Sequence, residues 1–289
     1  MRSKIYPLIN SCLHECYVEP FGGSGSMFFG REPQEGNFAE VYNDLNGLLC
    51  NLFRVLRDPL KVEELKRLCL CTPHSRRFWH ELKELCLAYL STDEERIQNA
   101  LALNNLASVP LDIAVAFAFF YCQNLGFGGI PLGSFGTEKR DLKHKSVALT
   151  YARRAQELPL FSRRLRGVTI ENLDFTQIFK YYDLQSTLFY CDPPYECATG
   201  YNIKGGSFGR FDTQDLVETL LNVKGSVILS CYFNDLYKPL LDAGYERVDF
   251  KSWVSASKIR GKINSRRIET VLFKIRYKDG LKPTLLECE

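Results

Sequence analysis

An apolar run, Thr187–Cys191, stops abruptly at Asp192, Pro193, Pro194 and Tyr195, and this junction constrains the fold more than any other part of the chain. The run predicts a buried strand. Proline has no backbone N–H and a fixed φ, so the two prolines cannot continue a hydrogen-bond ladder. The carbonyls ahead of them and the Asp192 carboxylate can accept hydrogen bonds from an amino group, and Tyr195 can stack on a flat ring. Methylation of an exocyclic amine on a nucleobase requires such a surface, and the alternative is a proline turn with a surface tyrosine.

Further strands are predicted on both sides of this junction, at residues 16–21, 40–44, 168–172, 227–232, 245–251 and 268–275. The first strand runs into Gly22, Gly23 and Gly25 and then an apolar segment. A strand, a glycine turn and a helix are the opening unit of a nucleotide-binding α/β sheet. The last two strands suit an antiparallel hairpin at a sheet edge, because no crossover helix need separate them.

The middle of the chain has a different pattern, that of consecutive helices. After a helix at about 45–56, helices are expected at 61–70, 75–90, 93–104, 110–124 and 145–158, with a glycine-rich segment at 126–136. The apolar stretch Leu111–Tyr121 is too short to span a bilayer and predicts a buried core helix. We therefore predict an α/β domain made of residues 1–57 and 167–289, interrupted by a helical domain at 58–166.

Composition narrows the class of protein. A chain of 289 residues with 45% hydrophobic and 25% charged residues is ordinary for a soluble globular protein. The net charge of +3 is too small to identify a nucleic-acid binder, although basic residues cluster at 76–77, 153–154, 163–166 and 258–267. Eleven cysteines without a secretory signal favour buried thiols in a reducing cytoplasm, with no membrane attachment. Cys69, Cys71 and His74 lack the paired spacing of a zinc site, so no metal is expected.

Two further acids follow predicted strands. Asp44 ends the second strand, where a carboxylate can hold two ribose hydroxyls, and Asp174 follows the third. Each acid taken alone is equally well explained as a helix N-cap. The ordered set of a glycine turn, two acids and Asp-Pro-Pro-Tyr, all at strand ends, describes a single cleft.

On these residues the chain resembles the D12-class, Dam-like DNA adenine-N6 methyltransferases of bacteria and phages. The resemblance rests on Ser3-Lys4, Val18–Gly25, Asn43–Asn46, Asn172–Phe175, Tyr190–Tyr195 and Arg267–Phe273. It spans nearly the whole chain, is weakest between 58 and 120, and follows the α-group motif order. It implies a Rossmann-like S-adenosylmethionine-dependent methyltransferase fold, with the helical insert as the target-recognition domain. One departure is that the chain starts too late to include the aromatic residue that usually precedes the family's first motif.

The resemblance also implies a cofactor site for S-adenosylmethionine. Lys4 would lie near the methionine end of the cofactor, Asp44 would hold the ribose hydroxyls, and Asp174 with Phe175 would contact the adenine. The full set of cofactor-binding residues expected is Lys4, Glu19, Pro20, Phe21, Gly22, Gly23, Gly25, Asp44, Leu45, Asp174, Phe175 and Asp192.

The expected reaction is direct transfer of a methyl group to the N6 amino group of adenine in double-stranded DNA. Asp192 and the Pro193 carbonyl would each accept one N6 hydrogen, beside Pro194, while the flipped base stacks on Tyr195. Residues 196–210, with Tyr201 and Lys204, would close over the base, or form a solvent-exposed linker. Sequence reading would belong to the insert, through segment 126–136 and the basic residues Lys139, Arg140, Lys143 and Lys145.

Other readings stay open. A methyltransferase acting on cytosine N4, RNA adenine or a protein amide differs mainly in the residue before the prolines, where Asp192 favours DNA adenine. A catalytically silent DNA-binding relative is a second alternative. A companion restriction endonuclease is compatible with the family, and the sequence does not indicate an oligomeric state.

Overall fold

The computed structural model describes residues 2–32, 38–126, 132–136, 146–194, 210–253 and 266–278, which fall into two compact units. The described residues up to 44 and from 173 onward form the first unit, here called the sheet unit. Those from 45 to 172 form the second, the helical unit. This unit begins before the predicted boundary at 58, because helix α3 (Gly47–Arg57) packs against the helices that follow it.

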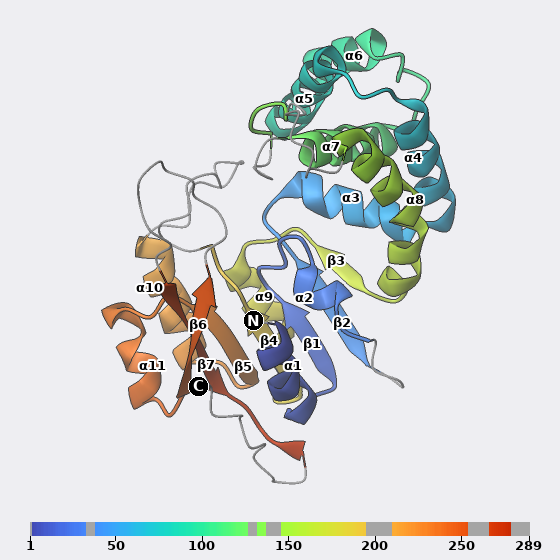
Figure 1. The fold of residues 1–289 in the computed structure, drawn as a ribbon. Helices are drawn as coiled ribbons and strands as arrows, with labels where there is room; N and C mark the ends of the chain where they lie inside the picture. Colours follow the sequence, from blue (N-terminus) through green and yellow to red (C-terminus); the bar gives the residue numbers. More distant parts are fainter. Residues whose placement is uncertain are drawn as a thin grey trace. The chain divides into compact units, whose positions relative to one another are not determined.

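A seven-stranded mixed sheet organises the α/β part of the chain (Figure 1). The strands are β1 (Cys16–Glu19), β2 (Ala39–Asn43), β3 (Thr169–Glu171), β4 (Thr187–Cys191), β5 (Ser226–Cys231), β6 (Glu246–Trp253) and β7 (Arg266–Lys274). Their order is β3-β2-β1-β4-β5-β7-β6. Strand β1 pairs in parallel with β2 and β4, and β4 pairs in parallel with β5.

All seven predicted strands are confirmed, with ends that differ by a few residues. The predicted antiparallel hairpin is also confirmed, because β6 pairs only with β7 among the described strands and lies at the sheet edge. Strand β7 in turn pairs antiparallel with β5. Across this hairpin Val248 pairs with Val271, whereas the neighbouring pairs on the opposite face include Arg247 with Leu272 and Asp249 with Thr270.

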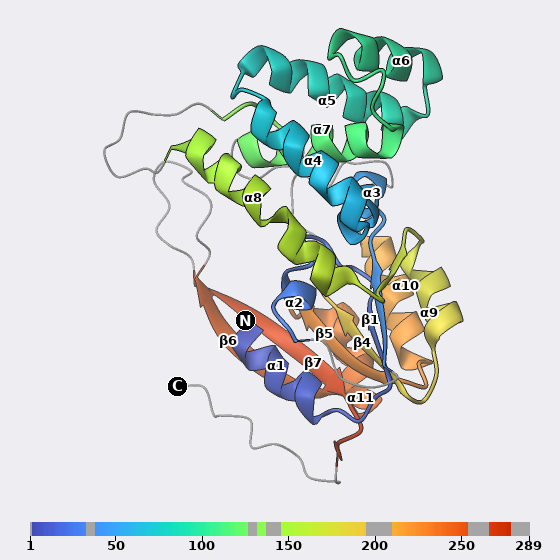
Figure 2. The ribbon, with the colours of Figure 1, turned by 90° about the vertical axis from the view of Figure 1, so that its right-hand side faces the viewer.

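Helices cover both faces of the sheet (Figure 2). On one face lie α9 (Phe175–Tyr182), α10 (Arg210–Leu221) and α11 (Lys238–Asp242), the last preceded by a short 3-10 turn, η2 (Asp235–Tyr237). On the other lie α1 (Arg2–Ser11) and α2 (Ser26–Phe29). The first group packs on alternate strand residues, including Val18, Phe189 and Leu229, all fully buried. Burial of each such side chain stabilises the fold by about 1.5–3 kcal/mol.

The helical unit is built around α7 (Leu111–Leu125), as the apolar run predicts. Around it lie α3, α4 (Pro59–Cys71), α5 (Arg76–Ser91) and α8 (Val147–Leu165), and α6 (Glu94–Leu103) packs on α5. Hydrogen bonds fix α7 against α5, since the Trp79 indole donates to the Cys122 carbonyl at 3.1 Å. None of the helices in the described part of the chain has the length and apolar character needed to cross a membrane.

A buried histidine makes the stability of the sheet unit depend on pH. His14 is 6% exposed, and one ring nitrogen hydrogen-bonds the Cys12 carbonyl at 2.8 Å. Burial lowers the pKa of His14 to about 4, and the positive charge of Arg31 adds to this while Glu40 opposes it.

The unfolded chain therefore takes up a proton at His14 near pH 6.5, whereas the folded chain does so only near pH 4. His14 therefore contributes about 3 kcal/mol to the free energy of unfolding above pH 6.5, and this contribution is lost as the pH falls toward 4. His14→Gln keeps a donor for the Cys12 carbonyl but does not titrate, so we expect a smaller loss between pH 7 and pH 4.5. Urea unfolding of both proteins across this range measures it, and equal losses would contradict the assignment.

Candidate active site

Three parallel strands end together at one edge of the sheet. Val18 of β1 lies beside Val41 of β2 and beside Phe189 of β4. Two residues beyond this level the chain reaches Pro20, Asn43 and Cys191, respectively, so the segments that follow all start from the same edge. In open α/β sheets ligands bind at the carboxyl ends of the strands. The predicted glycine turn, Asp44 and Asp192 therefore come from neighbouring strand ends.

Strand β4 presents Asp192 from a rigid base. All five residues of β4 are buried, whereas Asp192 is exposed, Pro193 is buried and Pro194 is half-buried. The Tyr190 hydroxyl lies 3.2 Å from Ser230 Oγ. Burial raises the pKa of Tyr190 well above its ordinary value, and the Asp192 charge adds to this, so the phenol stays neutral. The site thus has a surface carboxylate on an apolar, uncharged support.

Asn43 joins the strand ends through its side-chain amide, and it is 1% exposed. Its Nδ2 donates to the carbonyls of Pro20 at 2.8 Å and Leu173 at 3.0 Å. Its Oδ1 accepts from the Leu173 N–H at 2.9 Å. One side chain thus holds the start of the glycine turn and the segment before Asp174 in fixed positions. The sequence predicts only a helix cap at this position, and Asn-Asp at a strand end is its one visible signal.

The glycine turn needs glycine for two different reasons. At Gly22 a Cβ would lie 2.1 Å from the Tyr42 ring, so no side chain fits. Gly23 and Gly25 have φ values of 51° and 66°, in the left-handed region that other residues rarely adopt. The Gly22 N–H donates to the Asn43 carbonyl at 2.7 Å, and the Tyr42 hydroxyl donates to the Gly23 carbonyl. The turn is therefore held against β2 along its length.

Asp44 is attached to this turn. Its Oδ2 accepts from the Gly23 N–H at 2.8 Å, and the residue is half-buried. The structure thus brings together two residues that are 21 positions apart in the chain and that the sequence predicts in one cofactor site. Asn46, rather than Asp44, caps α3, since its Oδ1 accepts from the N–H groups of Leu48 and Leu49.

Asp174 occupies the N-cap of α9. Its Oδ1 accepts from the Thr176 N–H at 2.9 Å and from the Thr176 hydroxyl, and the residue is exposed. The cap explanation of this acid is therefore realised in the fold. The next residue, Phe175, lies with its ring centroid 5.4 Å from that of Phe21. This aromatic pair joins the β1 turn to the start of α9.

Glu19 belongs to a buried polar network. It is 1% exposed and accepts from the Tyr17 hydroxyl at 2.8 Å. The Arg31 guanidinium lies 3.9 Å over the Tyr17 ring and pairs with Glu40 at 2.7 Å, both side chains being almost fully buried. Buried charges of this kind are held by their partners, so the network fixes the first strand beneath the glycine turn.

The remaining predicted residues are placed as follows. Lys4 is half-buried on α1 in the sheet unit, and Leu45 is 49% exposed in the helical unit. Tyr195, Tyr201, Lys204, Lys139, Arg140, Lys143 and Lys145 lie outside the described residues. Within the described part of the chain, no three His, Cys, Asp or Glu side chains gather as metal ligands would.

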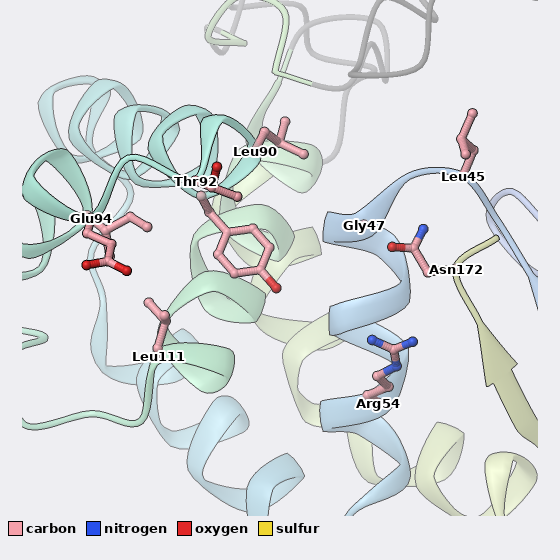
Figure 3. Close-up of a pocket in the computed structure, with 10 residues that line it drawn as sticks. Leu45, Gly47, Arg54, Leu90, Thr92, Glu94, Leu111 and Asn172 are labelled. Atoms are coloured by element: carbon pink, nitrogen blue, oxygen red, sulfur yellow. The ribbon is translucent and has the colours of Figure 1, made fainter. Parts of the chain in front are cut away.

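The helical unit has a cavity of its own, of about 520 Å³. Figure 3 shows Arg54, Asn172 and Gly47 on one side of it, and Thr92, Glu94 and Leu111 on the other. Arg54 donates to the Ile170 carbonyl at 3.4 Å. Leu45 is the one predicted site residue in its lining, and Asp192 and the glycine turn take no part in it. This cavity is therefore distinct from the set of residues at the strand ends.

The fold and the strand-end residues define an open α/β sheet of the nucleotide-binding class, carrying an Asp-Pro-Pro segment beside its glycine turn. A family model described as D12 class N6 adenine-specific DNA methyltransferase matches residues 2–260. The chain belongs to this family and is a transferase that methylates the N6 group of adenine in DNA. No curated protein matches the chain.

The Asn43 amide gives a direct test of the site's construction. Asn43→Ala leaves the Pro20 and Leu173 carbonyls and the Leu173 N–H without this partner, and each buried unsatisfied group costs about 1–3 kcal/mol. We expect Asn43→Ala to lower the free energy of unfolding by about 3 kcal/mol or more. Asn43→Asp keeps the acceptor for Leu173 but neither donor, and it adds a buried charge, so it should destabilise at least as much. Urea unfolding at pH 7.5 measures both, and a loss under 1 kcal/mol would show that Asn43 does not hold the strand ends.

Proposed function

We propose that this chain transfers the methyl group of S-adenosylmethionine to adenine N6 in double-stranded DNA at Asp192, Pro193, Pro194 and Tyr195. The observation that carries the proposal is the exposed Asp192 carboxylate at the end of fully buried β4, one strand away from the glycine turn that follows β1. The family supplies the reaction, and this arrangement supplies the residues that would perform it.

The residues around the glycine turn fit a nucleoside cofactor. The place where a side chain of Gly23 would lie has no other atom within 4 Å, so the backbone there can approach a ligand closely. Beside it, Asp44 is positioned by its bond from Gly23 to accept ribose hydroxyls. The paired rings of Phe21 and Phe175 offer an apolar wall for a purine.

The proposed cofactor-binding set is completed by eight further residues, namely Lys4, Glu19, Pro20, Gly22, Gly25, Leu45, Asp174 and Asp192. When bound, S-adenosylmethionine supplies a sulfonium methyl group as the electrophile. Glu19 belongs to this set as the buried last residue of β1 that supports the glycine turn, because its carboxylate accepts from Tyr17.

The chemistry assigned to the protein is to make a poor nucleophile reactive. The adenine N6 lone pair is delocalised into the ring. Asp192 accepts one N6 hydrogen and the Pro193 carbonyl accepts the other, which draws the nitrogen toward a tetrahedral geometry with a directed lone pair. These acceptors also stabilise the positive charge that develops on nitrogen during transfer, and the excess proton leaves to water past the exposed Asp192 carboxylate. No base of high pKa is required before attack.

Two further parts of the proposal concern DNA. An adenine inside a duplex is out of reach, so the base is flipped out, and Tyr195 provides the ring on which it stacks. Residues 58–166 form the target-recognition insert that selects the site, and a companion restriction endonuclease is the expected partner if the chain belongs to a restriction–modification pair. Holding base and cofactor in line lowers the entropic part of the barrier.

The assignment of Asp192 is tested by comparing two acids. Asp192→Ala should lower kcat for methyl transfer by about 10²–10³-fold or more, because a charge-assisted acceptor of the transition state is removed. It should weaken S-adenosylmethionine binding less than Asp44→Ala does. Labelled methyl transfer to unmodified DNA and calorimetric cofactor titration measure the two effects. Wild-type activity in Asp192→Ala would refute the role, and label recovered only in cytosine, RNA or protein would refute the proposed reaction.

A further inference from the structure

A short segment, Leu132–Gly136, is fastened to helix α5 within the helical unit. Its backbone bridges the end of α7, since Phe135 pairs with Gly126 and the Gly136 N–H donates to the Leu125 carbonyl at 2.8 Å. At its other end the Lys83 ammonium donates to the Gly133 carbonyl at 3.1 Å. The segment is thus held by α5 on one side and by the end of α7 on the other.

The Phe135 ring is half-buried and lies against side chains at and just before the start of α5. The His74 ring lies 5.1 Å away at 30°, and the Trp79 ring lies 6.2 Å away, edge to face. The Arg76 guanidinium stands 5.0 Å over the ring. Aromatic pairs of this kind contribute beyond their buried area, and a cation over a ring face is attracted to it. Phe135 therefore fixes the segment and also orients Arg76.

Arg76 and Lys83 occupy one face of α5. They are seven residues apart, which is about two turns or roughly 10 Å along the axis. His80 lies between them on the same face and is exposed, as is Arg76, while Lys83 is half-buried. Lys83 also stands 5.3 Å from the Trp79 ring, so its stem and charge are held near the segment.

The charge of this face is not neutralised within the described part of the chain. Helix α5 has two acids, Glu81 and Glu84. Glu81 pairs with Arg77 at 2.7 Å, and Glu84 pairs with Arg96 of α6 at 3.1 Å. Among the described residues neither Arg76 nor Lys83 has a carboxylate within ion-pair distance.

Three basic side chains of α4 and one of α8 do have carboxylate partners. On α4, Lys61 pairs with Asp112, Lys66 with Glu63 and Arg67 with Glu64. On α8, Arg153 lies 3.8 Å from Glu157. Among the described residues, the α5 face therefore differs from that of α4, because neither Arg76 nor Lys83 is paired with a carboxylate.

We infer that this α5 face, made of Arg76, His80 and Lys83 with the segment Leu132–Gly136, is a surface by which the helical unit contacts the phosphate backbone of duplex DNA. The inference rests on the proposed function, which makes DNA the substrate. Fixed cations without carboxylate partners bind phosphates and release counterions, so their contribution appears in the salt dependence of binding. Phe135 is the positioning residue of this surface.

Arg76 and Arg77 provide a matched test, because they are adjacent, both exposed and differ in partner. Arg76→Gln and Arg77→Gln change the net charge equally. Binding of a labelled 30-base-pair unmodified duplex is measured by fluorescence anisotropy between 50 and 300 mM NaCl. We expect Arg76→Gln and Lys83→Gln each to reduce the slope of log Kd against log salt by about 1, the value for one lost phosphate contact, and Arg77→Gln to leave it unchanged. Equal slopes for Arg76→Gln and Arg77→Gln would overturn the inference.

Phe135 is tested by a pair of substitutions in the same assay. Phe135→Ala should weaken duplex binding and raise KM for DNA, with S-adenosylmethionine affinity unchanged, whereas Phe135→Tyr should restore both. Wild-type binding by Phe135→Ala would exclude it as a positioning residue.

Methyl transfer by the wild-type protein is followed in parallel. If the wild-type protein methylates adenine but Arg76→Gln leaves the salt slope unaltered, the inference about the α5 face is refuted and the proposed function stands. If the wild-type protein transfers no methyl group but binds the duplex and shows the slope change, the proposed function is refuted and the inference about the α5 face stands.

Discussion

The side-chain amide of Asn43 is the interaction on which the arrangement of the strand ends depends. A parallel sheet aligns the carboxyl ends of β1, β2 and β4, but the segments that leave those ends diverge unless something joins them. Asn43 offers a donor and an acceptor in one plane, and it bonds to both the Pro20 and Leu173 segments. The bond from Gly23 to Asp44 and the pairing of Phe21 with Phe175 depend on those two segments being in place.

The acids in and directly after strands β1, β2 and β4 divide into two groups by burial. Glu19 and Glu40 are buried, and their carboxylates are used by Tyr17 and Arg31. A carboxylate removed from water is costly unless it is paired, so these two acids are committed to holding the first strands. Asp44 and Asp192 are half-buried and exposed, respectively, and lie where a ligand can reach them. The division explains how these strands can carry several acids of which two, Asp44 and Asp192, face the proposed reactants. Asp174, at the N-cap of α9, is the third acid assigned to them.

Local patterns predict most of the sheet and part of the site. Apolar runs predict the strands, the edge hairpin and the buried helix α7. The N-cap role of Asp174 follows from residues only a few positions apart. The Asn43 bonds reach Pro20, 23 residues away, and Leu173, 130 residues away, and the Phe135 cluster joins residues about 60 apart, so no local pattern contains them. The start of the helical unit at residue 45 could not be predicted for the same reason, because the sequence pattern of the helix at 45–56 does not show which unit it packs against.

Charge clusters in a sequence are a poor measure of the charge that a surface presents. The sequence alone does not distinguish Arg76 from Arg77, yet Arg77 is neutralised by Glu81 while Arg76 lies over a neutral ring. The same holds across the helical unit, where several basic residues of α4 and α8 are used in ion pairs. A chain with a net charge of only +3 can therefore still present local positive surfaces to a polyanion. What decides DNA affinity in such a protein is which cations the fold leaves without a carboxylate, and packing around Phe135 is one way of holding such a cation in place.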